Sequence, residues 1–206
     1  LKENKIDYYE TGIEHGTITA VIDNNRFEIT SLREDISTDG RHAKVKFSKD
    51  WKEDAKRRDF TFNSIYADQE GNLFDPFDGM SDLGIGLIKF IGETDIRVKE
   101  DYLRILRYIR FFLSYSKIPH DLKTIKKLKI NISGVAKLSK ERLLDELRKL
   151  IKPHTIVKLS KDQISVELIT TIFPELKNIK IFSKLKSYQI DYLKQIDFIV
   201  FLSLMV

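Results

Sequence analysis

The spacing of apolar residues changes near residue 90, and this change limits the folds that the chain can adopt. Before it, short segments alternate between apolar and polar residues, and seven of the nine glycines lie there. Alternation with a period of two is typical of half-buried strands. After Gly92 the apolar residues recur at helical spacing almost throughout. The sequence therefore predicts an α+β fold, in which a small mixed sheet with helices is followed by an all-helical part.

The first part contains three predicted strands, residues 17–23 (TITAVID), 26–32 (RFEITSL) and 43–47 (AKVKF). The first two are expected to form a hairpin whose turn contains Asn24 and Asn25. Residues 50–67 have a helical pattern that predicts two helices broken near residues 58–60. Turn-forming residues follow at 71–72 and at 75–79 (DPFDG).

The second part contains two apolar stripes at helical spacing, which predict two amphipathic helices packed on a core. The first stripe consists of Ile105, Leu106, Ile109, Phe112 and Leu113, and the second of Leu143, Leu144, Leu147, Leu150 and Ile151. Ser139 is the expected N-cap of the second helix. The lysine-rich residues 123–129 are either a basic surface or the solvated face of a helix.

Composition excludes several classes of protein. The 206 residues contain no cysteine, which rules out disulfides and thiolate metal sites and favours a cytoplasmic protein. The longest apolar stretch, residues 198–206, is too short to span a bilayer, so no membrane partner is expected. The net charge of +5 and the pI near 9.1 fit a polyanionic partner such as nucleic acid, although many other proteins are equally basic.

A row of charged residues marks the helix that is predicted to begin at Glu100. Asp101, Arg104, Arg107 and Arg110 recur every three residues and form a ridge, with Tyr108 and Phe111 flanking it. Asp101 and Arg104 are expected to be neighbours on one face. One interpretation is an ordinary Asp–Arg helix pair beside solvated arginines.

The other interpretation is that this pair reads a nucleotide base. Cytosine and adenine both present an exocyclic amine beside a ring nitrogen that accepts a hydrogen bond. A carboxylate can accept from the amine while a guanidinium donates to the ring nitrogen. Guanine and uracil present the opposite pattern and would leave buried polar groups unpaired. The remaining arginines could neutralise phosphates.

A second charged cluster occupies residues 53–63 (EDAKRRDFTFN), at a predicted junction between two helices. Thr61 or Asp59 could cap the second helix, whose free N–H groups would suit an anion. Ordinary capping beside a charged surface is the alternative.

Several segments, in order along the chain, resemble the motifs of the class II tRNA nucleotidyltransferases (CCA-adding enzymes) and bacterial poly(A) polymerases. Residues 57–63 (RRDFTFN) resemble RRDFTxN, residues 75–83 (DPFDGMSDL) resemble DPFGGxxDL with Asp78 in place of a glycine, and residues 100–111 (EDYLRILRYIRF) resemble EDxLRxLRxxRF. Residues 11–17 (TGIEHGT) and 27–30 (FEIT) resemble TGxxHGT and FEVT, and residues 139–147 (SKERLLDEL) are similar to SxERIxxEL.

The resemblance implies a division of the chain and a role for each motif residue. Residues 1–90 would be a partial nucleotidyltransferase head, 91–151 a helical neck that recognises the base, and 152–206 a helical body, truncated at its end. Asp101 and Arg104 would read the base of the incoming ATP or CTP. The resemblance places Arg58, Arg107 and Arg110 at the nucleotide, mainly at its phosphates. It also implies that Arg57, Asp59 and Asn63 support the motif around Arg58.

The chain also departs from the family. Family heads begin with a GGxVRD loop and a DxD pair that binds two Mg²⁺ ions, and no GG, GxVRD or DxD occurs in the 206 residues. Two-metal catalysis needs paired carboxylates. Glu28 is the remaining candidate for a catalytic carboxylate, but it fits an outward-facing strand residue equally well. Mg²⁺ is thus the family's expected cofactor, without retained ligands here, and the chain is expected to be a fragment that is inactive alone.

The resemblance leaves the activity and the state of the chain open. CCA addition to the 3′ end of tRNA and polyadenylation of RNA share these motifs. The chain could work with a separate polypeptide that carries the missing head segment, or it could be a remnant that binds nucleotide or RNA without catalysis. A helical interaction protein is a third possibility, which the four charged residues of the ridge disfavour.

Overall fold

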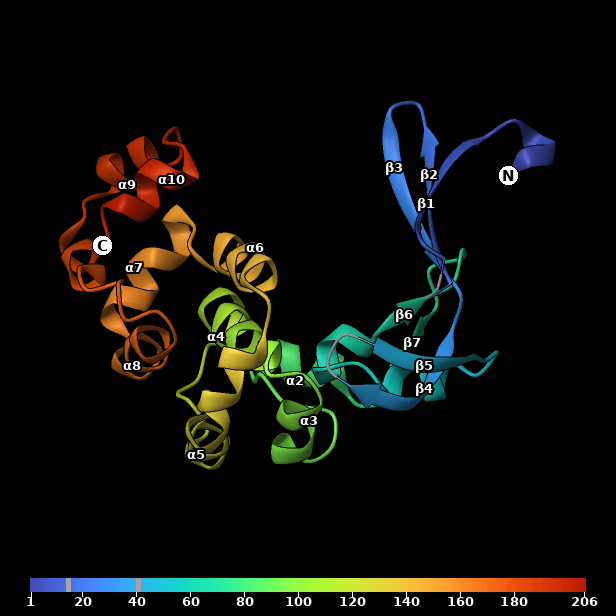
Figure 1. The fold of residues 1–206 in the computed structure, drawn as a ribbon, viewed down its shortest axis with the longest axis horizontal. Coiled ribbons are helices and arrows are strands. Elements are labelled where there is room, and N and C mark those ends of the chain that lie inside the picture. The colour runs from blue at the N-terminus through green and yellow to red at the C-terminus, as the bar shows by residue number, and fades with distance from the viewer. Residues whose placement is uncertain (14–15, 40–41) are drawn as a thin grey trace. The chain divides into compact units, whose positions relative to one another are not determined.

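The computed structural model describes residues 1–13, 16–39 and 42–206, with the backbone alone for residues 34–39, 42–45 and 187. Glu14 and His15 of the TGIEHGT segment lie outside the described residues. The chain divides into two compact units, Leu1–Arg58 and Asp59–Val206, and each is described by itself. Strands dominate the first unit and helices the second (Figure 1), which confirms the α+β class. Among the described residues, no helix is long and apolar enough to cross a membrane.

The first unit is built on an antiparallel sheet with the strand order β1-β2-β3. In this sheet Thr19 pairs with Tyr9 on one side and with Glu28 on the other. A separate hairpin, β4-β5, and a short helix complete the unit. The elements are η1 (Lys2–Asn4), β1 (Asp7–Gly12), β2 (Thr17–Ile22), β3 (Asn25–Thr30), β4 (Arg33–Asp39), β5 (His42–Phe47) and α1 (Trp51–Lys56). The three predicted strands are confirmed as β2, β3 and β5.

The turn between β2 and β3 lies one residue earlier than predicted. Asp23 and Asn24 have φ angles of 50° and 63°, which aspartate and asparagine tolerate better than other side chains. A two-residue hairpin turn of this kind requires positive φ at both positions. Asn25 already belongs to β3 and pairs with Ile22.

The second unit consists of short helices around one apolar core, together with a two-stranded ribbon. Its elements are η3 (Thr61–Ser64), β6 (Tyr66–Ala67), β7 (Leu73–Phe74), α2 (Gly79–Ile85), α3 (Thr94–Glu100), α4 (Leu103–Tyr115), α5 (Leu122–Asn131), η4 (Ile132–Lys137), α6 (Lys140–Leu150), α7 (Pro153–Lys161), α8 (Gln163–Ile172), η5 (Ile179–Lys184), α9 (Ser187–Leu193) and α10 (Phe198–Ser203).

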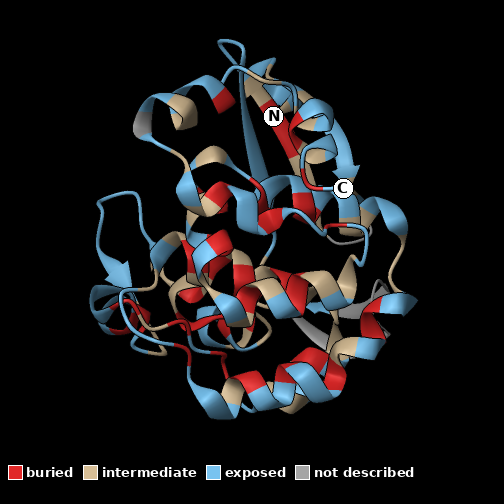
Figure 2. Ribbon diagram, turned by 90° about the vertical axis from the view of Figure 1, so that its left-hand side faces the viewer, coloured by how far each residue is buried: buried red, intermediate tan, exposed pale blue. Residues whose placement is uncertain are grey.

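Helix α4 lies at the centre of this core. Ile105, Leu106 and Ile109 have no exposed surface, as their helical spacing predicts. Buried segments recur along the helices (Figure 2), and the three arginines of α4 are of intermediate exposure.

Helix α6 packs beside α4 (Figure 1) and is capped as predicted, because the Ser139 hydroxyl accepts the N–H of Arg142. Leu147 and Leu150 are buried, but Leu144 is 41% exposed, so its predicted place in the core is wrong. At about 100° per residue, Leu144 lies roughly 60° from Leu147 and roughly 120° from Leu150 around the helix axis, at the edge of the buried face. The lysines of residues 123–129 are exposed on α5, which fits both interpretations of that stretch.

Candidate functional site

The turn between α3 and α4 carries the residues that the sequence predicts to read a base. Glu100 is the last residue of α3 and α4 begins only at Leu103, so the predicted helix start at Glu100 is wrong. Asp101 has an extended backbone, with φ −153° and ψ 106°, and its Oδ1 accepts the N–H of Leu103 at 3.1 Å. An aspartate that accepts a free N–H of the first helical turn favours a helix start at that point. Asp101 therefore lies on the turn, and the three arginines of the ridge lie on α4.

Arg104 is held by two acceptors from α3. Its Nη1 donates to Glu100 Oε2 at 2.7 Å and to the carbonyl oxygen of Arg97 at 2.7 Å. Glu100 also pairs with Arg97. Burial and the nearby Arg104 charge lower the pKa of Arg97, while Glu100 opposes that shift. The Arg104 side chain is 13% exposed, so its guanidinium is fixed in orientation.

Asp101 has its side-chain partner on α6. Its Oδ2 accepts a hydrogen bond from Arg142 Nη2 at 2.7 Å. The backbone N–H of Arg104 donates to the carbonyl oxygen of Asp101 at 3.1 Å, so the two backbones meet at the turn, but Asp101 does not share a helix face with Arg104 as predicted. Their carboxylate and guanidinium are oriented by different partners, Arg142 for the first and Glu100 for the second.

The far end of the ridge makes a second ion pair with α6. Arg110 Nε donates to Glu146, which is 2% exposed. The Arg110 guanidinium also lies over the Phe111 ring, 4.0 Å from its centroid. Phe111 thus flanks the ridge as predicted. Tyr108 does not, because it is buried in the core, where its hydroxyl bonds His120 Nδ1 at 3.1 Å.

Arg107 connects the middle of the ridge to the RRDFTFN segment. Its Nε donates to Asp59 Oδ2 at 2.5 Å. Burial by itself would raise the pKa of Asp59, but the Arg107 charge and hydrogen bonds from Arg107, Asn63 and the Phe60 N–H outweigh it and hold that pKa below 3.8. Asp59 is therefore an anion that holds Arg107 and Asn63 together in the second unit.

The prediction that Thr61 or Asp59 caps a second helix is wrong. The residues after them form a single 3₁₀ turn, η3, whose N-cap is Phe60 without a side-chain hydrogen bond. Thr61 Oγ1 donates to Asp82 Oδ2 at 2.8 Å instead. A single 3₁₀ turn lacks the aligned peptides of a long helix, so the predicted anion site at this point is not supported.

Arg57 and Arg58, at the end of the first unit, share one carboxylate. Asp54 has no exposed surface, and it accepts from Arg57 Nη2 at 2.6 Å and from Arg58 Nη2 at 3.0 Å. Sequence reasoning missed Asp54 as the residue that orients both arginines. Its spacing of three and four residues from them, at the end of α1, was the available signal.

The DPFDG segment shows why the related motif has a glycine where this chain has Asp78. Asp78 adopts φ 57° and ψ 32°, the left-handed region, which glycine enters without strain and aspartate tolerates. The Asp75 carboxylate accepts the N–H groups of Gly79 and Met80, each at 2.8 Å. A Cβ added at Gly79 would lie 2.3 Å from the carbonyl oxygen of Thr61. The two motif segments therefore pack directly on each other.

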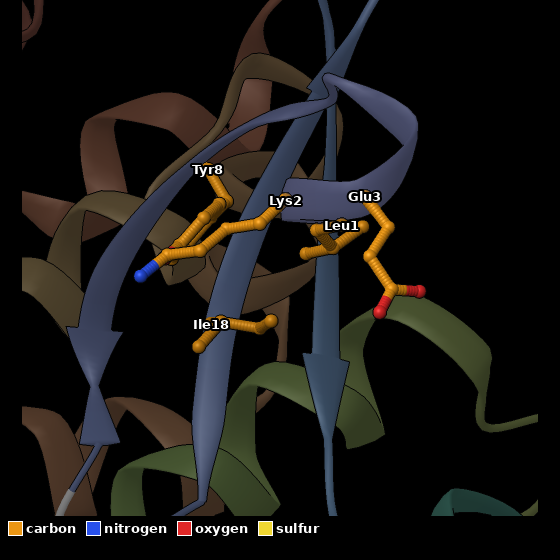
Figure 3. Close-up of a pocket in the computed structure, with 5 residues that line it drawn as sticks. All are labelled: Leu1, Lys2, Glu3, Tyr8 and Ile18. Atoms are coloured by element: carbon orange, nitrogen blue, oxygen red, sulfur yellow. The ribbon is translucent and has the colours of Figure 1, made fainter.

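Glu28 lies on the exposed strand β3 and lines an open hollow of about 650 Å³ with Tyr9, Thr11, Thr19 and Arg26. A second hollow, of about 400 Å³, is lined by Ile18 and Tyr8 of the sheet and by residues 1–3 at η1 (Figure 3). Ile18 and Thr19 are consecutive in β2, so the two hollows lie on opposite faces of the sheet.

The side chains around Glu28 do not fit a site for two Mg²⁺ ions. Two-metal catalysis needs paired carboxylates, and Glu28 is the one carboxylate among the described residues that line the hollow. Across the described part of the chain, no three His, Cys, Asp or Glu side chains come together as ligands for one ion.

Comparison with known proteins gives consistent matches. Residues 1–89 match the family described as the Poly A polymerase head domain. The mitochondrial CCA tRNA nucleotidyltransferase 1 of Homo sapiens is 47% identical over 142 residues, which make up 68% of this chain and 33% of that protein. The CCA-adding enzyme of Listeria monocytogenes is 37% identical over 182 residues, 87% of this chain and 46% of that protein.

A solved structure agrees with the sequence matches. The Bacillus stearothermophilus CCA-adding enzyme in complex with CTP superposes with a TM-score of 0.64 at 25% identity, covering 90% of this chain and 54% of that one. The chain spans about a third to a half of the length of the curated relatives that it matches.

Proposed function

Because this chain belongs to the family of CCA-adding enzymes and poly(A) polymerases, we propose that it selects the nucleotide for a tRNA nucleotidyltransferase, which adds CMP and AMP to the 3′ end of tRNA. The observation that carries this proposal is the turn between α3 and α4. There Asp101 and Arg104 are joined by a backbone hydrogen bond, and the carboxylate of the first and the guanidinium of the second are each oriented by partners of their own.

This pair suits the Watson–Crick edges of cytosine and adenine. Asp101 accepts from the exocyclic amine, and Arg104 donates to the ring nitrogen. A guanidinium carries five N–H donors on three nitrogens, and the bonds of Arg104 to Glu100 and to the Arg97 carbonyl both use Nη1. Guanine and uracil place a donor against Arg104 and an acceptor against Asp101, and each such mismatch leaves a partly buried group unpaired.

The remaining cations serve the phosphates in this proposal. Arg107 and Arg110 follow Arg104 along α4, and Arg58 belongs to the RRDFTFN motif. Their carboxylate partners fix the guanidinium orientations before a nucleotide arrives, which lowers the entropy lost on binding. Residues 91–151 are thus proposed to be the base-recognising neck, between the head at 1–90 and the body at 152–206.

Replacing Arg104 tests the base-reading role. Arg104→Ala should weaken the binding of both ATP and CTP at least tenfold, equivalent to about 1.4 kcal/mol, because the donor to the ring nitrogen is lost. Titration of each nucleotide into the 206-residue chain measures this. Arg148→Ala is the matched control, since Arg148 is also a neck arginine but lies over Phe198. Unchanged affinity of the Arg104 variant would reject the proposal.

Catalysis by this chain alone is a separate prediction. The sequence has no DxD pair, and the described carboxylates do not gather as metal ligands, so the 206 residues are proposed to transfer no nucleotide by themselves. The assay is incorporation of labelled CTP and ATP into tRNA that lacks its 3′ end, with Mg²⁺ present. Incorporation by the chain alone would contradict this. Incorporation only after addition of a polypeptide with the GGxVRD–DxD segment would support it.

A further inference from the structure

Helix α6 presents two opposite charges to the ridge, one helical turn apart. Arg142 reaches Asp101 and Glu146 reaches Arg110, so each end of the ridge has a partner of opposite charge on the same neighbouring helix. The side chains of Arg142 and Asp101 are 25% and 21% exposed. A pair this shielded is screened less by salt than a fully exposed one.

The contacts of Asp101 leave its carboxylate little freedom to rotate. Oδ1 accepts the N–H of Leu103 at 3.1 Å and Oδ2 accepts from Arg142 at 2.7 Å. Each carboxylate oxygen has two lone pairs, so both oxygens can make these bonds and one can still accept from a base. The direction of the remaining lone pairs is fixed by Arg142 and by the backbone.

We propose that Arg142 is a positioning residue that sets nucleotide specificity by holding the Asp101 carboxylate in one orientation. This inference rests on the proposed function, because it assigns to Arg142 the selectivity of the Asp101–Arg104 pair. A carboxylate fixed in this way can only accept, which suits the amine of cytosine or adenine. A carboxylate without Arg142 can turn, and its lone pairs then no longer point in one direction toward the amine of cytosine or adenine.

The opposite role for Arg142 would be competition with the base for Asp101. In that case its guanidinium would mask the carboxylate, and nucleotide binding would have to displace it. The hydrogen-bond count favours positioning, because Arg142 and the Leu103 N–H use one lone pair on each oxygen and leave one on each for a ligand. The two roles predict opposite changes of affinity when Arg142 is removed.

The test is titration of CTP, ATP, UTP and GTP into the 206-residue chain and its variants. Arg142→Ala should weaken CTP and ATP binding about tenfold and bring the affinity for UTP closer to that for CTP. Arg142→Lys should restore part of the affinity for CTP and ATP and part of the discrimination against UTP, because the charge returns without the planar fork of the guanidinium. Arg148→Ala, an arginine of the same helix, should leave affinity and discrimination unchanged.

The outcomes separate this inference from the proposed function. If Arg104→Ala impairs binding while Arg142→Ala keeps wild-type affinity and discrimination, only the role of Arg142 is overturned. Tighter binding by Arg142→Ala would also overturn it, in favour of competition. If Arg104→Ala has no effect, the proposed function itself fails. Should Arg142→Ala not fold, Arg142→Gln decides in its place, and wild-type discrimination by that variant overturns the inference.

Discussion

At the scale of single residues, Asp59 links the stability of the second unit to pH. It is 7% exposed, and its pKa is held below 3.8, because Arg107, Asn63 and the Phe60 N–H outweigh the effect of burial. A carboxyl whose pKa is lower in the folded state stabilises the fold above its unfolded pKa. That contribution is lost as the pH falls below 3.8 toward the folded value.

Replacement of Asp59 should reveal this contribution. Asp59→Asn removes the charge beside Arg107 and should lower the free energy of unfolding at pH 7 by about 2 kcal/mol. The loss should be smaller at pH 3, where the wild-type carboxyl is closer to protonation. Urea unfolding of both proteins at the two pH values measures the difference. An equal loss at both pH values would show that Asp59 acts through packing alone.

Sequence reasoning identified the charged residues of the candidate site but missed three of the groups that hold them, Asp54, Arg142 and Glu146. Arg104, Arg107 and Arg110 were found because their spacing on one helix is visible in the sequence. Arg142 is 41 positions from Asp101, and a single sequence does not show which distant side chains meet. Whether these residues bind a nucleotide stays a prediction that the titrations test.

At the scale of elements, the turn that carries Asp101 is held in place by a neighbouring 3₁₀ helix. Tyr102 follows Asp101 in the turn and packs against Gly134 of η4, where an added Cβ would lie 2.1 Å from Tyr102 Cε1. The Lys137 ammonium lies 5.7 Å from the centroid of the same ring. Only a residue without a side chain fits at position 134 while Tyr102 stays where it is.

Gly134→Ala is therefore expected to move Tyr102 and the turn with it. Overpacking of this kind costs about 1–3 kcal/mol, and a displaced Asp101 should weaken CTP binding. Thermal unfolding and a CTP titration measure the two effects. The control is Gly84→Ala in α2, where nothing lies within 4 Å of an added Cβ and alanine favours the helix by about 0.5–1 kcal/mol. Equal behaviour of the two variants would contradict the packing argument.

The elements that the sequence predicted well are those with strong apolar periodicity, such as α4 and α6. The break between α3 and α4 was missed because residues 93–110 contain neither proline nor glycine, the residues that most often mark the end of a helix in a sequence. Strand β1 was missed because its residues are mostly exposed at the edge of the sheet, so its polar sequence shows no apolar alternation.

At the scale of the whole molecule, apolar burial is distributed unevenly. The described core cluster lies entirely within Asp59–Val206, with α4 at its centre, whereas every residue of β3 is exposed. Local stability follows buried apolar contacts. The two units should therefore differ in how readily their backbone hydrogen bonds open.

Hydrogen exchange followed by mass spectrometry should show this difference. Amides of α4 are expected to exchange slowest and those of β1–β3 fastest, with the slowest amides reporting the global free energy of unfolding. Equal protection of β3 and α4 would mean that the sheet is stabilised by contacts other than its own apolar burial.

The pairing of Asp101 with Arg142 has a consequence for how such a chain can change over evolutionary time. The two codons are 41 positions apart, yet the residues are bound to each other, so a substitution at one alters the selective pressure on the other. A substitution at position 101 alone leaves the Arg142 guanidinium without its carboxylate partner until position 142 also changes. Positions 101 and 142 are then expected to vary together, and so are positions 110 and 146. A change of nucleotide preference by design accordingly requires joint randomisation of both members of a pair.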